Sequence, residues 1–331
     1  MTQKTLTTLI IGCGHIGGGV GLPNLGEEAL SHADAFEKHS GFRIAAGVDP
    51  DANRRTAFVD NDYASHAFAT LSQALDSGQT FDVASVCAPS EHHADLLWQL
   101  LEADIGLVLC EKPLTTQTAE SERIVAAYAK AGKPLGVAYT RRWHRAVEDI
   151  ATELADGQWG QIRSVLARYT RGVRNTGGHV IDLLHMLIGP MVIRYAGNPR
   201  FDYSPDDPTL DAVLIARDDI TVHLIGGDGR DYGLLEVQLM TEAGSITFED
   251  WTTRVRRRKT LSYRYAPHMR TLEEGAWQDY GAGRSFEAMI DNVYRTSVEG
   301  LPLASDGTNA LAAERLIESL IKTATKSEAA P

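Results

Sequence analysis

The residues best suited to chemistry begin with a glycine-rich hexapeptide. Gly12-Cys13-Gly14-His15-Ile16-Gly17 directly follows the apolar run Leu6–Ile11, an order typical of a strand, a tight turn and a helix. The first glycine permits the turn, the second lets the backbone approach a pyrophosphate, and the third lets the helix pack on the strand. The helix N-terminus adds unpaired N–H groups and a partial positive charge. The pattern predicts a dinucleotide site with contacts from Gly12, Gly14, His15, Ile16 and Gly17; the alternative is an ordinary glycine-rich turn.

A carboxylate follows the second apolar run, Phe42–Val48. At this point Asp49 could accept hydrogen bonds from both ribose hydroxyls and repel a 2′-phosphate, which favours NAD over NADP. Arg54 and Arg55 could neutralise a 2′-phosphate, so NADP stays possible, and Asp49 could instead belong to a turn and helix cap. Asp49 follows Gly12 by 37 residues, beyond the usual gap of about 20, and the extra segment 18–41 could overhang the site.

Two further strand ends carry motifs that fit one family. Ser85-Val86-Cys87-Ala88-Pro89 is followed by His93, and Cys110-Glu111-Lys112-Pro113 is followed by Glu120. This series resembles the Gfo/Idh/MocA family of nicotinamide-dependent oxidoreductases, named for glucose–fructose oxidoreductase and inositol dehydrogenase. The resemblance extends over nearly the whole chain. A lysine at a strand end is usually a solvated residue, but ligands bind at the carboxyl edge of a parallel sheet, which favours a functional Lys112.

The resemblance implies that Lys112 projects into the cleft beside a cis Pro113, near the nicotinamide. A lysine there can orient the reacting oxygen and stabilise its developing negative charge. The remaining cofactor contacts that it implies come from the two strand-end motifs: Ala88, Pro89, His93, Glu111 and Lys112. No metal is expected.

The second catalytic signature of the family is Asp-x-Gly-x-His-x-x-Asp. Residues 175–182 match it with Asn175 in place of the first Asp, and we prefer this register to one that pairs Asp182 with His185. On a helix, His179 and Asp182 lie within about 60° of each other, whereas His185 points about 120° away from His179. His179 would then accept a proton during alcohol oxidation, since the ordinary pKa of histidine lies near neutrality. The alternative is a structural histidine at a helix start.

Asn175 departs from the family pattern. Because an amide carries no charge, Lys112 would lose charge support and its pKa should fall relative to the Asp-bearing pattern. Either Asn175 orients the substrate together with Asp182, or the activity has been lost. The segment that follows the last N-terminal strand contains Tyr139, Arg142 and Trp143. These side chains could line a sugar pocket by hydrogen bonding and stacking, or the segment could form a domain hinge.

The elements that must position these residues predict an α/β fold in two domains. Residues 1–140 alternate short apolar runs with helical patterns, which predicts a doubly wound parallel Rossmann sheet that binds the dinucleotide. Residues 141–331 contain many strand-like runs and few helices, which predicts a mixed or antiparallel sheet with one face covered. The resemblance implies that these residues form an α/β domain for substrate binding. The resemblance implies that this domain holds a large open, mostly antiparallel sheet, which often forms the interface of a dimer or tetramer. The final helix could pack back on the first domain.

Charge and cysteine usage limit the partners and the compartment. The net charge of −12 argues against nucleic acid or an anionic membrane as a partner. Three scattered cysteines indicate a reducing compartment, and an N-terminus without signal-peptide features favours the cytoplasm. No stretch of 18 uncharged apolar residues occurs, so no membrane span is expected.

The expected function is an NAD(P)-dependent oxidoreductase acting on a secondary hydroxyl or ketone of a sugar, cyclitol or sugar derivative. Two alternatives remain open. One is a dinucleotide-binding regulatory or inactive homologue without turnover, which the Asn175 substitution favours. The other is a lyase or epimerase that holds NAD tightly and cycles it between its redox states.

Overall fold

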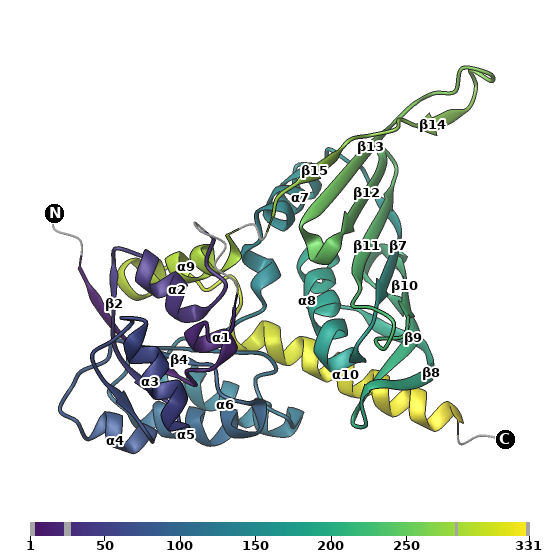
Figure 1. Cartoon of the computed structure of the whole chain (residues 1–331). Helices are drawn as coiled ribbons and strands as arrows, with labels where there is room; N and C mark the ends of the chain where they lie inside the picture. Colours follow the sequence, from purple (N-terminus) through teal and green to yellow (C-terminus); the bar gives the residue numbers. More distant parts are fainter. Residues whose placement is uncertain (1–3, 23–27, 282–283, 329–331) are drawn as a thin grey trace. The chain divides into compact units, whose positions relative to one another are not determined.

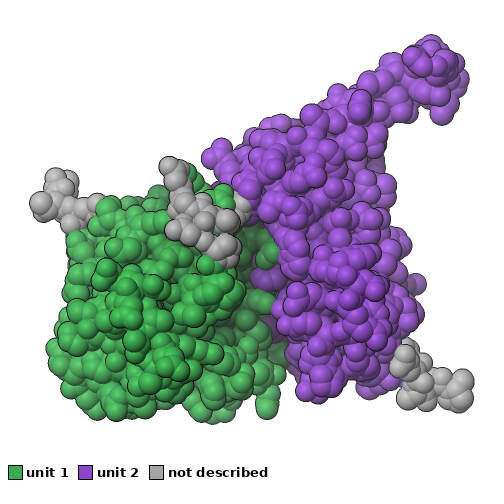
Figure 2. Space-filling view, viewed as in Figure 1, with its two compact units in different colours: residues 1–143, 284–311 green, residues 144–283, 312–331 purple. Residues whose placement is uncertain are grey.

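The computed structural model describes residues 4–22, 28–281 and 284–328. It divides into two compact units, shown in Figures 1 and 2. Unit 1 comprises residues 1–143 and 284–311, and unit 2 comprises residues 144–283 and 312–331. The chain therefore leaves unit 1 after residue 143, returns to it at residue 284 and leaves it again after residue 311, so a segment near the C-terminus completes the core that the N-terminal residues begin.

Unit 1 is built on a six-stranded sheet whose paired strands all run parallel. In spatial order its strands are β3 (Ala67–Phe68), β2 (Phe42–Val48), β1 (Leu6–Ile11), β4 (Val83–Val86), β5 (Leu107–Cys110) and β6 (Leu135–Val137). Strands β4, β5 and β6 are buried along their whole length, as expected for a sheet covered on both faces. The strand order reverses between β1 and β4, and ligands bind at such a switch point.

Helices connect the strands of unit 1. They are α1 (His15–Gly18), α2 (His32–Lys38), α3 (Ala52–Asp60), α4 (Leu71–Leu75), α5 (His93–Glu102), α6 (Thr118–Ala131) and α9 (Ser285–Glu299). Residues 23–27 lie outside the described part of the chain, so an overhang of the site by segment 18–41 stays a prediction; none of the segment's described residues lines the cavity reported below. The segment's helix α2 packs on β1, β2 and α9, where the edge of Phe36 meets Phe42 and Phe42 meets Tyr294. Burial of its apolar side draws this helix into the core.

The described residues of unit 2 form a nine-stranded mixed sheet. Its strands are β7 (Ile162–Tyr169), β8 (Val192–Ser204), β9 (Asp207–Ile215), β10 (Thr221–Gly226), β11 (Leu235–Thr241), β12 (Gly244–Glu249), β13 (Arg254–Ser262), β14 (Arg270–Leu272) and β15 (Trp277–Asp279). All described pairs are antiparallel except β7 with β10. Helices α7 (Arg145–Ala155) and α8 (Gly177–Ile188) belong to this unit, and α8 packs on β7 and β11.

These two sheets confirm the predicted fold class, a parallel Rossmann sheet followed by a mostly antiparallel one. The last helix, α10 (Gly307–Glu328), starts in unit 1 and ends in unit 2. Among the described residues, none of the helices combines the length and the apolar character needed to cross a bilayer.

A buried tyrosine ties two strands of unit 2 that are not neighbours. The hydroxyl of Tyr169 on β7 donates to the carbonyl of Leu210 on β9 at 3.0 Å and accepts from its amide at 2.9 Å. Strand β10 lies between these strands in the sheet, so the hydroxyl closes a contact that the strand ladder does not make.

Tyr169→Phe should therefore destabilise unit 2 more than an ordinary loss of one hydrogen bond. The variant leaves a buried amide and a buried carbonyl without this partner, and we expect the free energy of unfolding to fall by about 1–3 kcal/mol. Urea denaturation followed by circular dichroism measures the change. Tyr128→Phe is the control, because that hydroxyl donates to a single carbonyl, of Leu97, at 2.7 Å. Equal losses in the two variants would contradict the assignment.

Candidate functional site

A cavity of about 680 Å³ opens within unit 1 at the carboxyl ends of β1, β2 and β4. This is the point where the strand order reverses. Seven of the residues predicted from the sequence to bind a cofactor line the cavity: Gly12, Gly14, His15, Ile16, Asp49, Ala88 and Pro89. The glycine turn, the second strand end and the fourth strand end therefore meet at one edge of the sheet.

The glycine turn is built as the motif predicts. Gly12 has φ 96°, and a Cβ there would lie 2.6 Å from backbone atoms of Cys87 and Ala88. A Cβ on Gly17 would lie 1.9 Å from the Gly12 carbonyl oxygen, so this glycine serves helix packing and does not line the cavity. At Gly14 the nearest atom to an added Cβ is 3.5 Å away, on Arg54. Gly14 therefore leaves open space of the kind that a pyrophosphate needs.

The helix after the turn differs from the expectation. Helix α1 is a single turn of four residues that ends at Gly19, with φ 69°. Glycine is a poor helix former, and Gly17, Gly18 and Gly19 follow one another. Because a macrodipole needs aligned peptide units, one turn supplies N–H groups but little of the partial charge that a long helix would give.

Asp49 forms one wall of the cavity, and its side chain is only 2% exposed. Its carboxylate accepts the amide of Cys13 at 2.9 Å and the amide of Asp51 at 2.9 Å, with the Arg54 guanidinium 3.8 Å away. The Arg55 guanidinium donates to the carbonyls of Asp49 and Pro50 instead. Since a carboxylate has about four acceptor positions, this side chain retains acceptor capacity toward a ribose after binding two amides.

The lysine motif lies one strand away along the same edge. Strand β5 pairs with β4, and the amide of Glu111 donates to the carbonyl of Val86 at 2.9 Å. The Lys112–Pro113 peptide bond is cis, as the resemblance implied. Buried His93 has one ring nitrogen 2.9 Å from the carbonyl oxygen of Pro113 and the other 2.8 Å from that of Ala88. This histidine therefore fixes the lysine motif to the cavity wall.

Glu111 turns inward from this edge rather than toward the cavity. Its Oε1 lies 3.0 Å from Nε2 of His32, and its Oε2 accepts the amide of Lys112 at 3.2 Å. Burial would raise the pKa of Glu111, but the hydrogen bond and charge of His32, then the charge and amide of Lys112, hold that pKa below its usual value. Direct contacts of His93 and Glu111 with a cofactor stay predictions.

Unit 2 carries the second predicted group of residues. His179 and Asp182 both lie on α8, with Asp182 almost fully buried. A π-helical turn, Gly172–Thr176, precedes α8, and Asp207 accepts the amides of Arg174 at 2.7 Å and Asn175 at 2.9 Å. A carboxylate from β9 therefore supports the turn that holds Asn175. The catalytic and substrate roles of these residues stay predictions.

The residues after the last N-terminal strand are held inside unit 1. Tyr139, Arg142 and Trp143 are each at most 8% exposed. The indole N–H of Trp143 donates to the side chain of Asn292 on α9 at 3.0 Å, and Arg142 donates to the carbonyl of Ala304 at 3.4 Å. These contacts tie this segment to the returning C-terminal part of the unit. Roles for these three residues toward a substrate stay predictions.

Several cavity-lining residues were missed from the sequence. Polar ones include Thr70 and Ser72 after β3, and His92, Asp95 and Gln99 at α5. Strand β3 is two residues long, so its apolar pattern is too short to predict a strand. Among the described residues, no group of three or more His, Cys, Asp or Glu side chains could hold a metal ion. His32 was also missed; the one signal that could have found it was the unusual length between Gly12 and Asp49.

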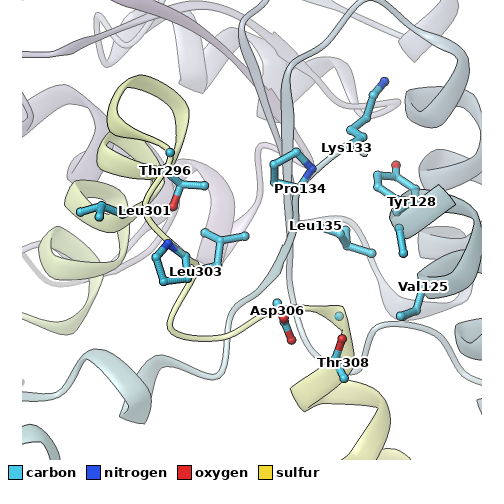
Figure 3. Close-up of a pocket in the computed structure, with 14 residues that line it drawn as sticks. Val125, Tyr128, Lys133, Pro134, Leu135, Thr296, Leu301, Leu303, Asp306 and Thr308 are labelled. Carbon is cyan, nitrogen blue, oxygen red and sulfur yellow. The ribbon is translucent and has the colours of Figure 1, made fainter. Parts of the chain in front are cut away.

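A second hollow in unit 1 lies away from these motifs. Figure 3 shows it between α6 and the segment that joins α9 to α10, with Tyr128, Lys133 and Leu303 among its lining residues. The Lys133 ammonium donates to the carbonyls of Leu100, Leu101 and Ala103 at the end of α5. This lysine therefore caps a helix, and the hollow adds nothing to the site.

Comparisons with known proteins agree with this geometry. Residues 6–139 match a family described as "Oxidoreductase family, NAD-binding Rossmann fold". The chain is 29% identical over 187 residues to an inositol 2-dehydrogenase of Corynebacterium glutamicum, covering 53% of this chain and 55% of the relative. It is 24% identical over 216 residues to a D-apiose dehydrogenase of Paraburkholderia graminis, covering 60% and 54%. The chain thus spans about half the length of the curated relatives it matches.

A solved structure extends the likeness to both units. It is an oxidoreductase of Agrobacterium radiobacter in complex with NAD+, L-tartaric acid and magnesium, with a TM-score of 0.77 and 16% identity. The match covers 98% of this chain and 97% of that one. At this identity the match establishes the fold of the whole chain, while the family match covers the dinucleotide-binding part.

Two glycine variants should separate folding from nucleotide binding. Gly14→Ala should leave stability nearly unchanged, because its Cβ meets nothing closer than 3.5 Å, but should weaken NAD binding at least tenfold by occupying the pyrophosphate approach. Gly12→Ala should destabilise the fold itself, because its Cβ would overlap Cys87 and Ala88. Calorimetric titration with NAD and thermal unfolding measure the two effects. Unchanged NAD affinity in Gly14→Ala would contradict the proposed path of the pyrophosphate.

Proposed function

We propose that this chain, whose residues 6–139 match a family of NAD-binding oxidoreductases, transfers a hydride between nicotinamide and a secondary hydroxyl or ketone of a sugar, cyclitol or sugar derivative. Residues 1–140 would bind the dinucleotide and residues 141–331 the substrate. NAD is the favoured cofactor because of the buried Asp49 carboxylate in the cavity wall. The Arg54 side chain beside it is half-exposed and could neutralise a 2′-phosphate, so NADP is the second cofactor to be tested.

The observation that carries this proposal is the cavity at the carboxyl edge of the parallel sheet. It combines an open glycine turn with a carboxylate at the end of β2, two features that suit a pyrophosphate and a ribose. The lysine motif lies on the neighbouring strand end and is held to the cavity wall through His93. This arrangement supports a reaction at the nicotinamide end rather than nucleotide binding alone.

The proposed chemistry divides between two side chains. The Lys112 ammonium orients the substrate oxygen and stabilises negative charge on it in the transition state. His179 accepts the hydroxyl proton when an alcohol is oxidised and returns it when a ketone is reduced. The nicotinamide, when bound, takes or gives the hydride. Asn175 and Asp182 would orient the substrate through hydrogen bonds. Sugars and cyclitols fit this scheme, because a neutral polyol needs no charge attraction to an acidic protein.

The test is a panel of polyols, cyclitols and sugars assayed with NAD and with NADP at 340 nm. We expect turnover with NAD on at least one cyclitol or sugar. Lys112→Ala and His179→Ala should each lower kcat by at least 100-fold, because each removes a group that acts on the reacting oxygen. NAD affinity should stay within about threefold of the parent in His179→Ala, since that residue is not among the predicted cofactor contacts, and the NAD affinity of Lys112→Ala measures the cofactor contact that the resemblance implies.

The same experiment separates the alternatives. Stoichiometric NAD binding without turnover on any member of the panel would favour a regulatory or inactive protein. Co-purified NAD with product formed and no net NADH would favour a lyase or epimerase cycle. Full activity in Lys112→Ala would remove the proposed role of that residue whichever substrate is found.

Self-association through the sheet of unit 2 is part of the proposal. The pairing register places Tyr195, His223, Ile225 and Met240 on the face opposite the buried side chains of the same strands. Three of these, Tyr195, Ile225 and Met240, are large hydrophobic residues about half exposed. An apolar group of this kind on a sheet supports an interface between copies of the chain, a dimer or tetramer.

Met240→Glu should weaken that association. Its register partners, Ser164 and Ser245, carry no charge, so a carboxylate covered there by a second copy would lose solvation without gaining a partner, and we expect the sedimentation coefficient to fall toward the monomer value at micromolar concentration. Val298→Glu is the control, because Val298 is an equally exposed apolar residue on α9 of unit 1. A parent chain that sediments as a monomer would refute this part of the proposal.

A reducing compartment is also part of the proposal. All three cysteines lie in the described residues, where each is buried and none forms a disulfide bond. This supports a reducing compartment such as the cytoplasm.

A further inference from the structure

A buried chain of polar groups leads from the core of unit 1 to the lysine motif. Ser85 Oγ lies 2.8 Å from Nδ1 of His32, and Nε2 of His32 lies 3.0 Å from Oε1 of Glu111. The other carboxylate oxygen of Glu111 accepts the amide of Lys112 at 3.2 Å. The side chain of His32 is fully buried and that of Glu111 is 14% exposed. Of these four residues, only His32 lies outside the sequence motifs.

The surroundings of His32 hold its ring in one orientation. It is the first residue of α2, and the edge of Phe286 from α9 packs against it with ring centroids 5.6 Å apart. The polar groups that face it come from two neighbouring strands: Ser85 lies on β4, Cys87 directly follows β4, and Glu111 directly follows β5. Ser85 Oγ also lies 3.6 Å from Sγ of Cys87. Three elements therefore fix the histidine between the core and the carboxylate.

The charge state of the pair follows from these partners. Burial would lower the pKa of His32, but interactions with Cys87 and Glu111 outweigh burial and raise that pKa to about 10. The same contact holds the pKa of Glu111 below its usual value. Both shifts favour an imidazolium beside a carboxylate. The imidazolium then donates from Nε2 to Glu111 and from Nδ1 to Ser85, which matches both distances.

We propose that His32 is a positioning residue for the reaction, which fixes the Glu111 carboxylate and offsets its negative charge so that Lys112 presents its ammonium in a set orientation and charge state. This inference rests on the proposed function, in which Lys112 acts on the substrate oxygen. Glu111 acts on Lys112 in two ways, by binding its amide and by attracting its ammonium. The cation on His32 opposes the second effect, since it neutralises the carboxylate that stabilises the ammonium.

Two substitutions should move the titration of Lys112 in opposite directions. His32→Gln retains an amide donor for Glu111 but removes the positive charge, so the carboxylate acts uncompensated and the Lys112 pKa should rise. Glu111→Gln removes the negative charge, so the Lys112 pKa should fall. The expected shifts are on the order of one pH unit, as for a charge removed from the immediate neighbourhood. A structural role alone would not produce shifts of opposite sign.

The measurement does not need a substrate. Competitive acetylation of the full chain with acetic anhydride at a series of pH values, followed by mass spectrometry of the peptide that contains Lys112, gives the titration midpoint of its amine. Ser85→Ala is the matched control. It removes the hydroxyl beside Nδ1 of His32 at the same buried site and leaves the charges of His32 and Glu111 in place. We expect its Lys112 midpoint to lie within about 0.3 pH units of the parent, well below the shift for a removed charge.

Each outcome decides the proposal. Midpoints that rise in His32→Gln and fall in Glu111→Gln support it, and unchanged or parallel shifts overturn it. If the variants do not fold, the imidazole of His32 in the parent chain is titrated by NMR: protonation that persists to about pH 10 supports the pair. A midpoint near the ordinary histidine value of 6.5 overturns it. If no substrate is turned over but the opposite shifts appear, the proposed function fails and the coupling stands.

With a substrate in hand, the alkaline limb of kcat gives a second readout. It should move up in His32→Gln and down in Glu111→Gln, following the Lys112 midpoints, while NAD affinity changes little. Movement of KM for NAD with an unmoved kcat limb would assign the pair to cofactor binding and overturn the positioning role.

Discussion

The carboxyl edge of the parallel sheet must hold two carboxylates out of water, and the rest of unit 1 is arranged around that constraint. A buried carboxylate is costly unless it is paired or hydrogen-bonded. Asp49 meets the requirement with two backbone amides and a nearby guanidinium that is half-exposed. Glu111 meets it with one amide and a buried histidine, His32. The second solution requires an additional helix, α2, to bring that histidine into the core.

Much of the fold could be predicted because it depends on local patterns. The apolar runs Leu6–Ile11 and Phe42–Val48 are the observed bounds of β1 and β2. When a continuous apolar run is bounded by glycine and polar residues, the two ends of a buried parallel strand can be predicted from the sequence. Strand β3 has two residues, and its pairing is decided by β2, so no sequence period could indicate it.

The site was most predictable where a residue must have one identity for a backbone reason. Gly12 and Gly14 are fixed by a left-handed turn and by open space, and both line the cavity. His93 and Trp143 show the opposite case, since their types suit a ligand while their polar atoms meet Ala88, Pro113 and Asn292 within unit 1. A side chain's type does not reveal its partners when they are far away in the sequence.

Asn175 illustrates that the type of one residue does not by itself determine the charge around it. The amide itself is neutral, which predicts a site with one negative charge fewer. In unit 2, however, Asp207 extends from β9 to the same turn and accepts the amides of Arg174 and Asn175. A buried carboxylate therefore still stands at the turn that leads into α8 and His179. Charges interact through space and not through sequence position. The carboxylate beside this turn therefore comes from Asp207, which begins β9 32 residues after Asn175.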